Sequence, residues 1–258
     1  MIGAMAGDII GSVFEWNPVK TTDFPLFSPR SRFTDDSVLT AAVALAIMTD
    51  GDYAASIKRL GRRHADAGYG GRFQQWLHAQ SNLPYNSWGN GAAMRVGPVG
   101  FAFDTVAQVL LEAKRSAEIT HNHPEGIKGA QAVALAVFLA RSGKNKHNIQ
   151  NQVRQRFGYD LNRRLAEIRP GYGFDVSCQG SVPEAIIAFL EADSVEDAIR
   201  NAVSLGGDSD TMACIAGCIA HAFYRSIPKH ISSQTKNILA PDLRDILRKF
   251  CRTYAINC

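Results

Sequence analysis

The sequence predicts an all-α protein, because helical signals extend along the chain and convincing strand signals are missing. Apolar residues recur with helical spacing through most of the 258 residues. Capping signals support this, as in Ser194-Val195-Glu196-Asp197, where Ser194 is expected to cap a helix with Asp197 at its third position. No repeat, low-complexity tract or linker-like shift in composition divides the chain. We therefore expect one all-α domain over residues 1–258.

Helical periodicity also predicts where the elements lie. Helices are expected at residues 2–16, 37–49, 53–66, 104–116, 126–141, 147–157, 182–192, 195–204, 211–225 and 242–254. Loops rich in Pro, Gly, Asn and Ser are expected at 17–33, 80–100 and 168–181. The first helix carries Gly3, Gly7 and Gly11 at a spacing of four, a flat stripe that would let another helix approach closely.

Composition and charge favour an ordinary globular protein. Hydrophobic residues make up 46% of the chain and charged residues 20%. The net charge of +4 is mild, and the basic residues are scattered without the interleaved aromatic residues of a nucleic-acid stacking surface. We therefore interpret them as solvated helix faces and expect no sequence-specific nucleic-acid binding.

The cysteines and the N-terminus bear on location. The five cysteines include no CxxC pair. Cys214 and Cys218 lie four residues apart on a predicted apolar helix and are expected to be buried core residues. A reducing compartment is therefore the simplest inference. The N-terminus has no basic segment, and Asp8 interrupts its apolar run, which argues against a signal peptide. The longest apolar run, residues 38–48, is too short to span a bilayer. We expect a cytoplasmic monomer without membrane association.

Two short segments concentrate carboxylates and threonine hydroxyls, and each leads into a long apolar, Ala-rich stretch. They are Thr34-Asp35-Asp36 and Gly206-Gly207-Asp208-Ser209-Asp210-Thr211. Four carboxylates held together would raise each other's pKa values unless cations lay between them. Two divalent cations would neutralise the four charges, and all-oxygen ligands favour Mg²⁺, Mn²⁺ or Ca²⁺ over zinc. Alternatively, these residues act only as helix N-caps.

Three further segments carry polar groups with two interpretations each. Asp8, Gly11, Ser12 and Glu15 share one face of the first predicted helix, which makes Glu15 either an exposed flank or a carboxylate facing a pocket. The small-residue loop from Ser87 to Arg95 is either a phosphate cradle or a turn at Asn90-Gly91. The pair of histidines in Thr120-His121-Asn122-His123-Pro124 either binds metal or makes loop hydrogen bonds.

Taken together, these motifs resemble the ADP-ribosylglycohydrolase family, which includes the dinitrogenase reductase-activating glycohydrolases. The resemblance rests on six segments: Gly7-Asp8…Gly11…Glu15, Thr34-Asp35-Asp36, Gly89-Asn90-Gly91…Met94-Arg95, Thr120-His121, Val182-Pro183-Glu184-Ala185, and Gly206-Gly207-Asp208-Ser209-Asp210-Thr211. They occur in family order, and the two acidic motifs are the specific ones. The resemblance implies an orthogonal helical bundle with a two-Mg²⁺ cleft that binds ADP-ribose.

The resemblance also implies roles for individual residues. One set of metal ligands would be Thr34, Asp35 and Asp36, and the other Asp208, Asp210 and Thr211, with Asp210 bridging. Glu15 would reach a metal and act as the catalytic carboxylate, with Asp36 and Asp210 completing the catalytic set. The diphosphate would bind the loop formed by Ser87, Trp88, Gly89, Asn90, Gly91, Ala92 and Ala93. His121 would lie near the reactive ribose, and the candidates for stacking on adenine are Trp88, Tyr172 and Phe174.

The implied reaction is Mg²⁺-dependent hydrolysis of the glycosidic bond between ADP-ribose and an acceptor, with Mn²⁺ as a possible substitute ion. The products would be ADP-ribose and the unmodified acceptor, which the sequence leaves open among arginine, serine, a nucleobase and a small metabolite. Two alternatives remain at this stage. One is a non-catalytic ADP-ribose-binding or structural protein on the same scaffold, and the other is a metal-dependent phosphoesterase acting on nucleotide diphosphates.

Overall fold

The structure is a computed structural model that describes all 258 residues, and it is built from helices. The first eight are α1 (Ile2–Gly11), α2 (Asp35–Met48), α3 (Tyr53–Arg63), α4 (Gly71–His78), α5 (Gly91–Arg95), α6 (Gly97–Ala102), α7 (Val106–Glu118) and α8 (Pro124–Arg141). The others are α9 (Lys146–Phe157), α10 (Leu165–Ile168), α11 (Cys178–Leu190), α12 (Val195–Val203), α13 (Ser209–Tyr224), α14 (Lys229–Ile238) and α15 (Pro241–Thr253). The only β-type pairing is one antiparallel bridge between Gly89 and Ser177, so the all-α prediction is confirmed.

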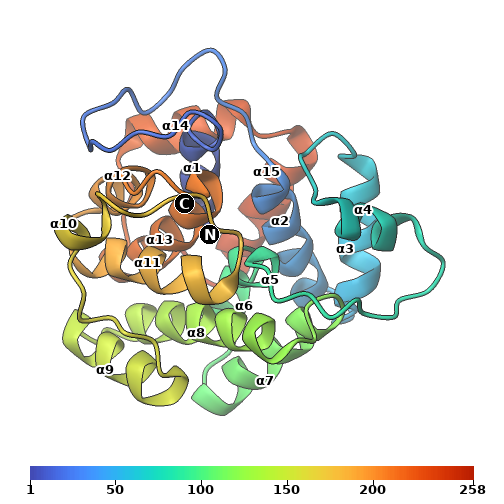
Figure 1. Ribbon diagram of the computed structural model, residues 1–258. Helices are drawn as coiled ribbons and strands as arrows, with labels where there is room; N and C mark the ends of the chain where they lie inside the picture. The colour runs from blue at the N-terminus through green and yellow to red at the C-terminus, as the bar shows by residue number, and fades with distance from the viewer.

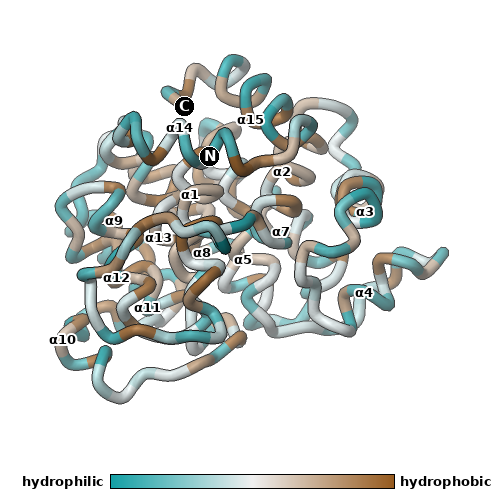
Figure 2. The backbone as a smooth tube through the Cα atoms, turned by 90° about the horizontal axis from the view of Figure 1, so that it is seen from above, coloured by the Kyte–Doolittle hydropathy of each residue, from teal (hydrophilic) through white to brown (hydrophobic).

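Helix α13 lies at the centre of the molecule, where α1, α8, α11 and α12 pack around it (Figure 1). The buried apolar side chains form one continuous cluster of 78 residues. Hydrophobic positions gather on these central helices, whereas the outer turns of α3, α4 and α15 carry hydrophilic residues (Figure 2). Burial of this cluster is the main force that favours the folded chain.

The glycine stripe of α1 packs directly on α13, as its spacing predicted. A Cβ atom at Gly3, Gly7 or Gly11 would overlap backbone atoms of α13. Only glycine permits so close an approach, which offsets its low helix propensity. The contact matters for the site, because it brings the face of α1 that carries Asp8 against the first turn of α13.

The first helix is shorter than predicted, and this places Glu15 outside it. Helix α1 ends at Gly11 rather than at residue 16. The Ser12 hydroxyl donates a hydrogen bond to the Ile9 carbonyl at 2.9 Å, and the Phe14 amide donates to the Gly11 carbonyl at 2.8 Å, which closes a turn. Side chain–backbone bonds of this kind compete with helix continuation. The prediction that Glu15 shares a helix face with Asp8 is therefore wrong.

Five helices of the structure were not predicted from the sequence. They are α4, α5, α6, α10 and α14. Helices α5 and α6 both begin in the stretch predicted as a loop at 80–100. Glycine and proline in this stretch indicate a loop, but both helices are short and mostly buried, and burial stabilises them. The loop predicted at 168–181 also ends early, because α11 begins at Cys178. The other predicted helices are confirmed to within a few residues at each end.

The cysteines behave differently from the expectation. Cys251 and Cys258 form a disulfide across seven residues of sequence, whereas Cys178, Cys214 and Cys218 are free and buried. The chain turns back after α15, with the Ile256 amide donating to the Cys251 carbonyl at 2.8 Å, and this reversal was not visible in the cysteine spacing. The inference of a reducing compartment from the absence of a pairing pattern therefore loses its basis. None of the helices combines the length and apolar character needed to cross a membrane.

Candidate metal and substrate site

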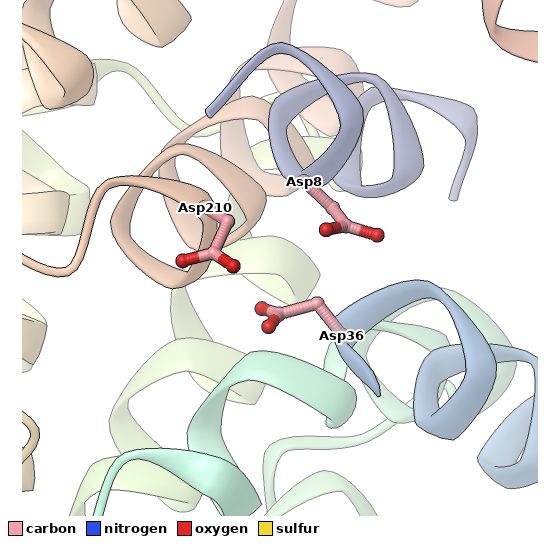
Figure 3. A group of neighbouring side chains, drawn as sticks. All are labelled: Asp8, Asp36 and Asp210. Carbon is pink, nitrogen blue, oxygen red and sulfur yellow. The ribbon is translucent and has the colours of Figure 1, made fainter. Parts of the chain in front are cut away.

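Carboxylates from three helices converge in the interior. Asp8 of α1, Asp36 of α2 and Asp210 of α13 point toward one another (Figure 3), and one oxygen of each lies within 4.8 Å of the other two. A second group of the same kind joins Glu15, Asp208 and Asp210. Asp210 belongs to both groups. The two acidic segments of the sequence, about two thirds of the chain apart, therefore meet at one place.

These five carboxylates lie close together without a basic partner. Four are buried and Glu15 is half-buried, and none forms a salt bridge with Lys or Arg. Burial, and next the charge of Asp210, raises the pKa of Asp8 and of Glu15 to about 7. The same two causes raise the pKa of Asp36 and of Asp208 well above the ordinary range. Such a cluster is stable at neutral pH only if it holds protons or cations.

The free oxygen atoms suit a divalent cation. Oδ1 of Asp36 is buried and has no hydrogen-bond partner, although such atoms are normally satisfied. Its other oxygen accepts a hydrogen bond from the Thr211 hydroxyl at 3.1 Å. Every side chain of the two groups offers only oxygen, which is the donor set of Mg²⁺, Mn²⁺ and Ca²⁺. The residues present therefore fit hard divalent ions.

Asp8 is the member of this site that the sequence reasoning missed as a possible ligand. Its carboxylate accepts hydrogen bonds from the Thr34 amide at 3.0 Å, the Thr34 hydroxyl at 2.6 Å, the Ser37 amide at 3.1 Å and the Ser37 hydroxyl. These four bonds fix the first turn of α2. The signal was its position three residues before Gly11 on α1, because a carboxylate beside a glycine stripe faces the helix that packs there.

The start of α13 is held by a different partner. Asp208 stands at the N-cap position but caps nothing with its side chain, so the simple capping interpretation fails there. Instead its Oδ2 atom accepts a hydrogen bond from Nδ2 of Asn90 at 2.7 Å. The same amide nitrogen donates to the Ser181 hydroxyl at 3.2 Å. Asn90 thus connects the 87–93 loop to the acidic cluster through its side chain.

The remaining predicted ligands lie at the edge of the two groups. The Asp35 carboxylate belongs to neither, although burial, and next the charge of Asp210, raises its pKa well above the ordinary range. The Thr34 hydroxyl is bonded to Asp8 and accepts a long hydrogen bond from the Asp36 amide at 3.4 Å, so capping does occur at α2. The Thr211 hydroxyl faces Asp36.

The 87–93 loop leads into α5 and leaves two amides without an acceptor. The Gly89 amide donates to the Ser87 hydroxyl at 3.1 Å, and the Asn90 amide donates to the Val176 carbonyl at 2.8 Å. The amides of Gly91 and Ala92 donate to no protein group. A phosphate cradle in this loop would therefore use these two N–H groups rather than those of Gly89 and Asn90.

His121 lies behind this loop. Its Nδ1 atom is 2.7 Å from the Thr120 hydroxyl, and burial, and next the charge of Arg95, holds its pKa well below the usual range. A Cβ atom on Gly91 would come within 3.0 Å of Nε2 of His121, so the glycine permits the close approach of the ring to this loop. His123 instead caps α8 by accepting from the Glu125 amide at 3.1 Å. Neither histidine joins a metal-ligand group, which favours the loop hydrogen-bond interpretation.

The three candidates for adenine stacking have different environments. Tyr172 is half-buried, and its hydroxyl donates to the Gly180 carbonyl at 2.9 Å. Trp88 and Phe174 are both exposed. Trp88 has only the His123 ring nearby, with centroids 5.7 Å apart, whereas Phe174 stacks on Trp16. Trp88 therefore presents an exposed ring on the 87–93 loop, whereas the Tyr172 side chain is held by its hydrogen bond to Gly180.

Comparison with known proteins decides the family. A family model described as ADP-ribosylglycohydrolase matches residues 1–257. The chain belongs to the ADP-ribosylglycohydrolase family. The family that the sequence motifs indicated is thereby confirmed.

Curated proteins resemble this chain in sequence, and a solved structure resembles it in fold. ADP-ribosylhydrolase ARH3 of Gallus gallus is 28% identical, over 87% of this chain and 84% of the relative. The Homo sapiens ADP-ribosylhydrolase ARH3 is 26% identical over 87% and 84%, and ADP-ribosylarginine hydrolase Tri1 of Pseudomonas putida is 25% identical over 87% and 69%. A structure described as an ADP-ribosylglycohydrolase-related protein complex matches with a TM-score of 0.71 at 22% identity, covering 98% of this chain and 97% of that one. The last comparison shows a shared fold.

Proposed function

We propose that this protein is a Mg²⁺-dependent hydrolase that cleaves the glycosidic bond between ADP-ribose and an acceptor, acting as a monomer with one domain over residues 1–258. The observation that carries the proposal is the pair of carboxylate groups that share Asp210. Membership of the ADP-ribosylglycohydrolase family supports it. So do the names of the relatives, which are ADP-ribosylhydrolases.

Two ions would be held by side chains that the fold already gathers. One ion would lie among Asp8, Asp36 and Asp210, and the other among Glu15, Asp208 and Asp210. Thr34, Asp35 and Thr211 are the further ligands that the family resemblance implies. Bound Mg²⁺, or Mn²⁺ in its place, would stabilise negative charge on substrate oxygens and lower the pKa of a water molecule.

The chain's own residues supply binding and proton transfer. Glu15 is the one half-buried carboxylate of the two groups, so it can reach both an ion and the substrate, which suits an acid or base at the glycosidic oxygen or nitrogen. The amides of Gly91 and Ala92 would bind the diphosphate, and neutral His121 would lie beside the reactive ribose. Trp88 offers an exposed ring to adenine. The products would be ADP-ribose and the unmodified acceptor.

The test is a metal-dependent release assay on a panel of ADP-ribosylated substrates with arginine, serine, nucleobase and metabolite acceptors. Metal-stripped protein should be inactive, and Mg²⁺ should restore release of ADP-ribose. Glu15→Gln should keep ADP-ribose affinity while turnover falls about 10²- to 10⁴-fold, the usual effect of removing a general acid or base.

Two outcomes would contradict the proposal, each in favour of one alternative. AMP or phosphate as product would identify a phosphoesterase. Tight ADP-ribose binding with no turnover of any substrate by the wild type would identify a binding protein.

A further inference from the structure

Two exposed aromatic side chains stack on each other next to the carboxylate group that contains Glu15. The rings of Trp16 and Phe174 have centroids 5.0 Å apart and an angle of 28° between their planes. Trp16 is 69% exposed and Phe174 48% exposed. Large aromatic side chains normally contribute to a core or an interface, so an exposed stack indicates a binding surface.

The two rings belong to segments that lie next to different members of the group formed by Glu15, Asp208 and Asp210. Trp16 directly follows Glu15. Phe174 directly follows Gly173, whose carbonyl oxygen would lie 3.1 Å from a Cβ atom on Gly207, the residue before Asp208. The stack therefore joins the turn that carries Glu15 to the loop before α11, which packs against the residue that precedes Asp208.

The order of groups along the substrate tells which part of it meets these rings. The proposed diphosphate amides belong to Gly91 and Ala92, and the reactive ribose lies between them and Glu15. The acceptor is attached to the far side of the scissile bond, which is the bond that Glu15 serves. The rings beside Glu15 therefore face the acceptor rather than the adenine, whose stacking partner would be Trp88 beside the diphosphate amides.

We infer that Trp16 and Phe174 form an acceptor-side subsite that contacts the polypeptide on either side of an ADP-ribosylated side chain. This inference rests on the proposed function and identifies the substrate class within it, a protein rather than a free metabolite. The two residues determine specificity and take no part in bond cleavage. Phe174, named above among the candidates for stacking on adenine, is thereby assigned to the acceptor.

The shape of the rim favours a polypeptide over a small acceptor. Four of the six large exposed hydrophobic residues lie on the loops around the site, namely Trp16, Trp88, Phe174 and Val176. The Cys178 amide donates to the Trp88 carbonyl at 2.9 Å, which holds the loop of Trp88 beside the loop of Phe174 and Val176. Val176, 51% exposed and two residues after Phe174, adds apolar surface beside the stack. Such a surface offers contacts that a short acceptor cannot reach but flanking peptide residues can.

The experiment compares two substrates that share one linkage. The first is a short peptide with one ADP-ribosylated side chain, in the linkage that the wild type hydrolyses, and the second is the same ADP-ribosylated amino acid with blocked termini. Wild-type KM should be lower for the peptide. Phe174→Ala should raise KM for the peptide about tenfold, as loss of one aromatic contact with the substrate implies, and leave KM for the blocked amino acid unchanged.

Three measurements separate this subsite from other roles. The affinity for free ADP-ribose, which lacks an acceptor, should be unaffected by Phe174→Ala and weakened by Trp88→Ala. Leu111→Ala, at another exposed apolar residue (57% exposed) on α7, should change nothing. Trp16→Ala should act like Phe174→Ala on the peptide, and the double variant should lose little more, because the two rings act as one stack.

The opposite results overturn the inference. A Phe174→Ala enzyme with the wild-type ratio of the two KM values has no acceptor-side subsite at this residue. An equal fall in kcat on both substrates would show that the stack only positions Glu15. If the wild type releases ADP-ribose from neither substrate nor from any other in the panel, the proposed function itself fails, which is a distinct result.

Discussion

The two acidic helix starts, at α2 and at α13, carry similar residues but are held in place by different parts of the chain. At α2, Asp8 of the neighbouring helix α1 accepts bonds from both Thr34 and Ser37. At α13, Asp208 is held by Asn90, which belongs to the loop proposed to bind the diphosphate. The α2 start is thus fixed by the helical core, and the α13 start is fixed by the substrate loop.

This difference separates the two proposed ions. The ion at Asp8, Asp36 and Asp210 would lie among helices whose packing does not depend on substrate. The ion at Glu15, Asp208 and Asp210 would depend on a turn after α1 and on the 87–93 loop. We therefore expect the first ion to bind independently of ADP-ribose and the second to bind more tightly when the loop is engaged.

Asp210→Asn should have the largest effect, because Asp210 is the one residue common to both groups. We expect loss of both ions, beyond the roughly 10- to 100-fold cost of losing an outer hydrogen-bonding partner. Calorimetry with Mn²⁺ on metal-stripped protein would measure this. The metal-free variant should melt no lower than the metal-free wild type, because it lacks a charge that raises the pKa of Asp36 and Asp208.

The control for this change is Asp245→Asn, at an exposed carboxylate on α15 that pairs only with Arg248. It should bind both ions as the wild type does. Retention of two Mn²⁺ events in Asp210→Asn would rule out a shared ligand at this position.

A smaller effect, confined to one ion, is expected from Asn90→Ala. Removal of the amide that donates to Asp208 should weaken the ion at Glu15, Asp208 and Asp210 about 10- to 100-fold and leave the other ion unchanged. Ser181→Ala removes the other partner of the same amide and should leave both affinities near the wild-type values.

The mirror-image change is Ser37→Ala, which removes a bond to Asp8 and should disturb the other ion instead. Two-site Mn²⁺ calorimetry on the three variants tests the comparison directly. Equal weakening of both ions by Asn90→Ala would show that the two helix starts form a single unit.

The sequence predicted the helices of this site better than the contacts between them. The apolar stretches of α2 and α13 were expected within two residues of their observed starts, because helical periodicity and acidic first turns are local signals. The glycine stripe also indicated the close packing of α1 on another helix. The bond between Asn90 and Asp208 spans 118 residues, and no local pattern encodes such a contact.

The main error in the predicted site, the placing of Glu15 on a helix, arises because local hydrogen bonds compete with continuation of α1. Glu15 was placed on a helix face because residues 2–16 have helical spacing throughout. The Ser12 hydroxyl and the turn at Phe14 end the helix earlier, and Glu15 reaches the cluster from a turn. Asp8, in contrast, does lie on the helix, and its place beside the glycine stripe was the signal for a ligand that went unused. Its hydrogen bonds to Thr34 and Ser37 became visible only with the structure.

The smallest expected effect is a pH dependence of the stabilisation by Mg²⁺. Burial and the charge of Asp210 raise the pKa of Asp8 and Glu15 to about 7, above an ordinary value of about 4. In the metal-free protein these groups hold protons below pH 7, so their contribution to the free energy of unfolding falls as the pH rises through 7. An ion must displace those protons, and its binding therefore strengthens over the same range.

The rise in Tm on adding saturating Mg²⁺ should thus be small at pH 5.5 and larger at pH 8, by about 2–4 °C for each kcal/mol of added binding free energy. Because each Tm with Mg²⁺ is compared with the metal-free Tm at the same pH, the titration of groups remote from the site cancels. Glu15→Gln removes one of the competing protons at the ion that depends on the turn and the loop, and should flatten the pH dependence without abolishing it. A Mg²⁺-induced rise in Tm that is equal at both pH values would show that the ions do not compete with protons for these carboxylates.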